Sequence, residues 1–60
     1  MRIYEIVTEY VKGKDKGATH DRFRVACETF DAALDHAKKH IARPESVRIQ
    51  SIELIADTVL

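Results

Sequence analysis

Two histidines in a stretch of helical period are the first residues that could do chemistry. His36 and His40 are four residues apart, the spacing that lets two imidazoles on one helix bind the same metal ion, and Asp35 precedes them. A zinc site needs three or four ligands, and no third ligand follows at a suitable spacing. Histidines near a helix C-terminus are also stabilised as partial cations that face water. We therefore expect both side chains on the surface, and predict no metal and no cofactor.

The single cysteine is the other residue with intrinsic reactivity. Cys27 lies two positions before Thr29, where a helix is expected to begin, and a helix N-terminus can lower the pKa of a thiol. Cys27 also alternates inward with Phe23 and Val25, and free cysteine is among the most buried residue types. We interpret it as a core residue. The sequence has no nucleophile, histidine and acid grouping and no glycine-rich phosphate loop before a helix, so we predict no catalytic residues and no enzyme.

Positive charges gather on one polar segment. Residues 12–20 contain both glycines and no large apolar side chain, which predicts a loop. Its lysines, with arginines of the following strand, could contact phosphates as a nucleic-acid-binding edge. The alternative is a solvated hairpin tip whose lysines keep an edge strand from aggregating. The nucleic-acid-binding edge would consist of Lys12, Lys14, Lys16, Arg22 and Arg24.

Two strands must position these charges. Residues 3–11 are rich in β-branched and aromatic types without helical period, which predicts a strand, and both of its faces are partly apolar. Residues 22–28 alternate polar and apolar types, which predicts a second strand paired back on the first as a hairpin. Because the first strand is apolar on both faces, we expect it at the centre of the sheet.

An amphipathic helix is expected next. Thr29 is a suitable N-cap, acidic and basic residues lie at the ends that the helix dipole favours, and Pro44 ends the helix. The apolar positions follow the helical period as one stripe. They are Phe30, Ala33, Leu34, Ala37 and Ile41.

A third strand is predicted over residues 47–55, although its apolar residues change from odd to even positions near Gln50 and Ser51. A β-bulge there would return them to a single inward face. The alternative is a short helix over residues 52–60, because apolar residues also recur there with helical spacing. We favour the strand for its β-branched content.

These elements predict one small α+β domain over residues 1–60, with a ββαβ order, a three-stranded antiparallel sheet in the order 2-1-3 and one helix on one face. The other face stays bare. It would carry one of the two apolar sets of the first strand, and we expect this set to be Tyr4, Ile6 and Tyr10. Exposed apolar patches of this kind usually mark an interface. The predicted partner-binding residues are Tyr4, Tyr10, Arg22, Arg24 and Arg48.

Composition bounds the partners and the compartment. The chain is 45% hydrophobic and 33% charged, and ten basic residues balance ten acidic ones, so nothing demands a polyanionic partner. No apolar run approaches the roughly 20 residues that span a bilayer, and charge interrupts the first residues too early for a signal peptide. We expect a cytoplasmic protein with no membrane contact. A bare sheet face also predicts a homodimer with Tyr4 or Tyr10 and residues 52–60 at the contact.

The run from Phe23 to Ala37 resembles the middle of the small phage-encoded inhibitors of bacterial host RNA polymerase, which are ββαβ proteins of similar size. The shared features are an alternating strand, a Glu-Thr-aromatic-Asp junction, an alanine-containing helix, a proline turn and a final strand, over Phe23 to Leu54. That family relies on arginines in its last strand, where this sequence has Ser51 and Glu53. The Glu-Thr-Phe-Asp-Ala-Ala-Leu run also resembles the hairpin-to-helix junction of HicB-type antitoxins.

These resemblances imply two functions. The first is a small non-catalytic protein-interaction domain, from a phage or another mobile element, that binds and inhibits a larger host protein such as RNA polymerase. The alternative is a nucleic-acid-binding or antitoxin-like regulator that uses the basic hairpin loop.

Overall fold

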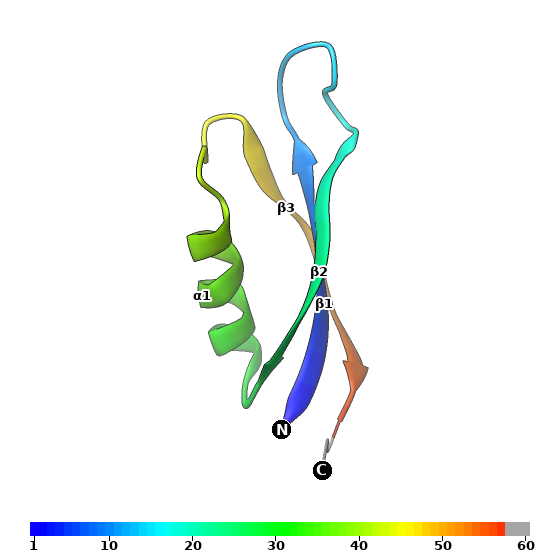
Figure 1. The fold of residues 1–60 in the computed structure, drawn as a ribbon, viewed down its shortest axis with the longest axis vertical. Helices are drawn as coiled ribbons and strands as arrows, with labels where there is room; N and C mark the ends of the chain where they lie inside the picture. The colour runs from blue at the N-terminus through cyan, green and yellow to red at the C-terminus, as the bar shows by residue number, and fades with distance from the viewer. Residues whose placement is uncertain (58–60) are drawn as a thin grey trace.

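The computed structural model describes residues 1–57 and confirms the ββαβ order (Figure 1). The sheet has the order β2-β1-β3, and β1 is antiparallel to both neighbours, as predicted. The single helix covers one face of the sheet, and none of the described elements covers the other (Figure 1). No helix within residues 1–57 is long and apolar enough to cross a membrane. The elements are β1 (Arg2–Tyr10), β2 (Thr19–Cys27), α1 (Phe30–His40) and β3 (Val47–Ala56).

The helix begins where its sequence predicts but ends at His40, ahead of the predicted end at Pro44, and Ile41 is already extended. The Thr29 hydroxyl accepts a hydrogen bond from the Ala32 N–H at 3.1 Å, which caps the first turn. At the other end the Ile41 N–H donates to the Lys38 carbonyl, and the chain leaves the helix at Ile41. Ala33 and Ala37 are fully buried. Their small side chains let the helix lie close to the sheet.

The predicted bulge in β3 is confirmed. Val7 of β1 pairs with Ser51 and the next residue, Thr8, pairs with Ile49, so Gln50 has no partner in the register. This extra residue keeps the apolar side chains on both sides of it on the face beneath the helix. The strand continues to Ala56, so the helix alternative is wrong as far as the structure describes that segment. Its last part, residues 58–60, lies outside the described residues.

The expected placement of Tyr4, Ile6 and Tyr10 is wrong. Tyr4 and Ile6 are only 3% and 0% exposed, and the Tyr4 ring packs edge-on against Phe30 of the helix, with ring centroids 6.1 Å apart. Side chains alternate along β1, so Tyr10 shares their face, and the open face carries the odd-numbered residues.

Charge explains which face of β1 is covered. Each face offers apolar side chains, but the odd-numbered set also contains Glu5 and Glu9, and a buried carboxylate is costly unless it is paired. Over residues 3–10 the even-numbered set has no charged side chain, and its Thr8 is fully buried with its hydroxyl hydrogen-bonded. Over these residues the helix therefore covers the face whose polar groups are neutral, and the face with two carboxylates stays open.

Candidate functional site

Three arginines lie on the open face of the sheet, around two glutamates of the central strand. The register places Arg24 of β2 opposite Glu5 and Arg48 of β3 opposite Glu9. Arg48 Nε donates to Glu9 Oε2 at 2.7 Å, the shortest of these contacts. Glu5 Oε1 lies 3.7 Å from Arg22 Nη1 and 4.0 Å from Arg24 Nε. We call this surface the arginine face, and its members are Glu5, Glu9, Arg22, Arg24 and Arg48.

The two kinds of charge on the arginine face differ in burial. The side chains of Glu5 and Glu9 are 19% and 12% exposed. The arginine side chains are much more open, at 62% for Arg22, 68% for Arg24 and 70% for Arg48. Exposed ion pairs of this kind contribute little to stability. Of the three arginines, Arg48 alone donates a hydrogen bond to a glutamate. Because a guanidinium has five N–H donors, most of the donors on this face remain available.

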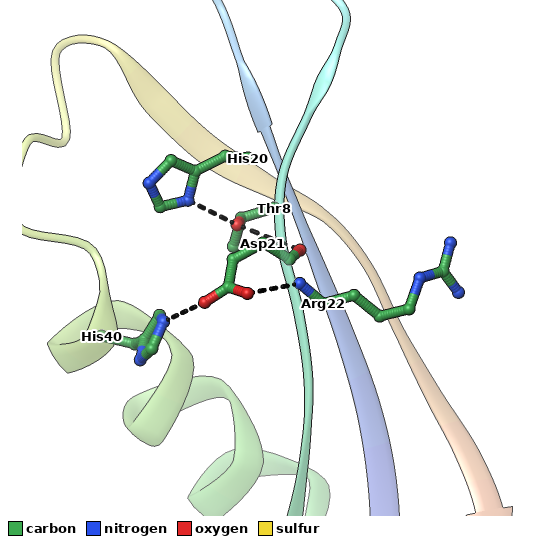
Figure 2. A network of polar contacts seen from close by, with 5 residues as sticks. All are labelled: Thr8, His20, Asp21, Arg22 and His40. Carbon is green, nitrogen blue, oxygen red and sulfur yellow. Dashed lines mark hydrogen bonds and ion pairs between the residues drawn. The ribbon is translucent and has the colours of Figure 1, made fainter.

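A second polar group links the helix to the sheet (Figure 2). His40 Nε2–H, from the last turn of α1, donates to Asp21 Oδ2 at 2.7 Å, and the other oxygen of that carboxylate accepts from the Arg22 N–H at 2.8 Å. These hydrogen bonds, that of His40 first, hold the pKa of Asp21 below its ordinary value. On the far side, His20 Nδ1 lies 3.0 Å from the hydroxyl oxygen of Thr8.

A bulge brings His20 and Asp21 to the same side of the sheet. Thr8 pairs with Asp21 and the next residue, Glu9, pairs with Thr19, so His20 is the unpaired residue. Sequence reasoning missed this group. The alternation of β2 predicts that Asp21 lies on the same side of the sheet as Phe23. The same alternation places His20 on the opposite side, so no sequence pattern predicts that His20 joins this group.

The group of His20, Asp21 and His40 has a structural role, because its hydrogen bonds join the helix to the sheet and β2 to β1. The hydroxyl in it belongs to Thr8, which is fully buried and therefore out of reach of a substrate. The Phe23 ring lies against His40, with centroids 4.1 Å apart, and His36 is further from it. His36 and His40 are both exposed, and residues 1–57 contain no group of three or more potential metal ligands. Cys27 is half-buried, with Sγ donating to a backbone carbonyl.

The residues proposed for nucleic acid are divided between two surfaces. Lys12 and Lys14 line a groove beside the β1–β2 hairpin loop, and Lys16 is not part of its wall. Arg22 and Arg24 belong to the arginine face, which lies on the other side of the sheet. The five side chains therefore do not form one continuous edge.

Comparisons with protein-family models, with curated protein sequences and with solved structures found no match to this chain. The resemblances to phage polymerase inhibitors and to HicB-type antitoxins stay predictions, and the function is argued below from the geometry.

Proposed function

We propose that this chain is a small non-catalytic protein-interaction domain that binds a larger protein through the arginine face. The observation that carries the proposal is the contrast in burial on that face. Two carboxylates are covered, and the guanidinium groups that cover them stay open to solvent. Arginine is enriched in protein interfaces and among the residues that dominate binding energy.

The arginine face is partly ordered before a partner arrives. Each arginine is on a paired strand with a glutamate within 4.0 Å, and Arg48 donates a hydrogen bond to Glu9, so binding loses less side-chain entropy than it would for free arginines. Val7 is buried between them and gives the face an apolar centre. The complementary surface is an acidic one, whose carboxylates can accept bidentate hydrogen bonds from the remaining guanidinium N–H groups.

The partner that we propose is a host enzyme, with bacterial RNA polymerase as the first to test. The sequence resemblance over Phe23 to Leu54 supports this choice, together with the shared ββαβ order. The resembling family has its arginines in the last strand. Here β2 contributes two and β3 one, and all three lie on the same face of the sheet. A protein with this target would act in the bacterial cytoplasm and fit a phage or mobile-element origin.

Transcription by purified bacterial RNA polymerase, with the protein titrated in, tests the proposal. We expect inhibition by the wild type, and no inhibition by a variant with all three arginines replaced by serine. The matched control removes the same positive charge from exposed lysines outside the arginine face. It carries Lys16→Ser, Lys38→Ser and Lys39→Ser.

The two triple variants separate a specific surface from a charge effect. Equally weakened inhibition in both would show that only net charge matters and would contradict the arginine face. If the wild type neither binds nor inhibits the polymerase, that partner is wrong. Affinity capture of other host enzymes with the same pair of variants then tests the interaction domain itself.

A further inference from the structure

A groove of about 580 Å³ lies between two loops at one end of the molecule. One wall is the β1–β2 hairpin loop and the other is the connection from α1 to β3, and both lie at the end opposite the chain termini (Figure 1). The volume is in the range of sites that hold small molecules. The side chains that matter for the argument are Tyr10, Lys12, Lys14, Asp15, His20 and Arg43.

The groove has an excess of positive charge. Lys12, Lys14 and Arg43 line the groove together with a single carboxylate, that of Asp15. Within residues 1–57 none of the three cations forms an ion pair, whereas every arginine of the arginine face does. Cations that converge on a concave site without counterions attract an anion. Arginine and lysine together suit phosphate, which the guanidinium binds in a bidentate manner and the ammonium binds as a point charge.

His20 is held at the wall of the groove with one ring nitrogen turned outward. The hydroxyl of buried Thr8 has one proton, which it donates to the Asp21 carbonyl at 3.4 Å. The same hydroxyl lies 3.0 Å from His20 Nδ1, which fixes the ring against the sheet. Figure 2 shows the second nitrogen, Nε2, on the side of the ring away from Thr8.

An aromatic surface lies beside the cations. The rings of His20 and Tyr10 meet edge to face, with centroids 5.1 Å apart and an interplanar angle of 85°. Tyr10 is half-buried, so part of its ring is open to the groove. Aromatic side chains next to a positively charged groove are the arrangement that proteins use to bind nucleotides, with phosphate on the cations and base on the rings.

We propose that this groove binds a nucleotide unit, either as a free nucleotide or as part of a single strand of RNA or DNA. Lys12, Lys14 and Arg43 contact the phosphate, and Tyr10 and His20 contact the base. This site is separate from the arginine face, and neither proposal depends on the other.

Titration calorimetry at about 50 mM salt, where phosphate contacts are strong, tests the site with three probes. The probes are inorganic phosphate, AMP and an oligouridylate of about eight nucleotides. We expect AMP to bind more tightly than phosphate, because only AMP uses the aromatic rings. An oligouridylate that binds at least tenfold tighter than AMP identifies a single strand as the ligand, and equal affinities identify a free nucleotide.

Three variants locate the site. Replacing Lys12, Lys14 and Arg43 with serine should weaken binding at least tenfold. The same variant should lower the salt dependence of oligouridylate binding by about 0.7 for each phosphate that it no longer neutralises. Asp15→Asn should tighten binding several-fold, because it removes the one opposing charge. Tyr10→Leu should weaken AMP binding about tenfold and leave phosphate binding unchanged.

The control has Lys16, Lys38 and Lys39 replaced with serine, and it should bind within twofold of the wild type. Circular dichroism confirms that each variant is folded before it is compared. Equally weakened binding in the control and the groove variant would overturn the proposal, as would no binding of any probe by the wild type. Binding of phosphate as tight as that of AMP would overturn the role of the aromatic rings.

Discussion

His40 and Asp21 join the end of the helix to an edge strand by a hydrogen bond of 2.7 Å, although they are 19 residues apart in the chain. The Phe23 ring also lies against the His40 ring. The His40 side chain is therefore held by an aromatic contact as well as by its hydrogen bond to Asp21. The short helix has only 11 residues, and isolated helices of that length are marginal in water. Its docking on β2 is therefore part of what keeps it folded.

The contribution of Asp21 to stability should depend on pH. The pKa of Asp21 is lower in the folded protein than its ordinary value of 3.8, because it accepts hydrogen bonds from His40 and from the Arg22 N–H. Its stabilising effect is then present above the ordinary value and is lost as the pH falls through the lower, folded value. We expect Asp21→Asn to be less stable than the wild type at neutral pH, and the difference to shrink below about pH 4. Thermal melts at a series of pH values measure it, and a difference that stays constant would contradict this role.

The packing of α1 on the sheet should not tolerate a larger side chain at Ala37. This residue is fully buried against the sheet, so Ala37→Leu should lower the free energy of unfolding by about 1–3 kcal/mol. Ala32 lies on the exposed side of the same helix, and Ala32→Leu is the matched control, expected to stay within about 0.5 kcal/mol. Urea denaturation compares the two. Equal effects would mean that the helix presents a different side to the sheet.

The hairpin loop should depend on the backbone freedom of Gly17. Its φ is +90°, and an added Cβ would meet no atom within 4 Å, so a substitution there acts through backbone strain alone. We expect Gly17→Ala to destabilise the protein by about 1–2 kcal/mol. The chain is short enough for chemical synthesis, and D-alanine at the same position, which favours positive φ, should stabilise it slightly. Melts of the three proteins decide, and destabilisation of the same size by both alanines would show that space rather than backbone strain is limiting.

The sequence predicted the elements, their order and the β3 bulge, because these follow from local alternation, capping and the geometry of connections. It did not predict which face of β1 the helix covers. The two faces of β1 have similar apolar content, with Tyr4 and Ile6 on one face and Ile3 and Val7 on the other. The faces differ in charge, because the face of Val7 also carries two glutamates. For a strand that is apolar on both faces, the position of the charged residues is therefore a better guide to the buried face than the apolar content.

Both candidate sites needed the tertiary structure. Arg48 and Glu9 are 39 residues apart, and their contact follows only from the register of β3 on β1. The groove joins Lys12 to Arg43 across two loops, and no spacing in the sequence relates them. His20 turns toward Thr8 because of a bulge at the start of β2, which has no sequence pattern of its own.

Self-association should involve β3, which is an edge of the sheet. Leu54 and Ile55 near its end are 47% and 39% exposed, and an apolar edge strand favours pairing with another strand. Of the two tyrosines expected at the contact, Tyr4 is excluded because it is buried beneath the helix.

We still propose a homodimer at micromolar concentration, now formed by two copies of β3 paired across a two-fold axis. Sedimentation equilibrium should show a dimer for the wild type and a monomer for Leu54→Lys, because the lysine replaces exposed apolar surface on the edge strand with a charge. Ala26→Lys, an exposed position on the other edge strand, is the control and should stay dimeric. A wild type that remains monomeric at high concentration would rule out the β3 dimer and leave Leu54 and Ile55 free to contact a different protein.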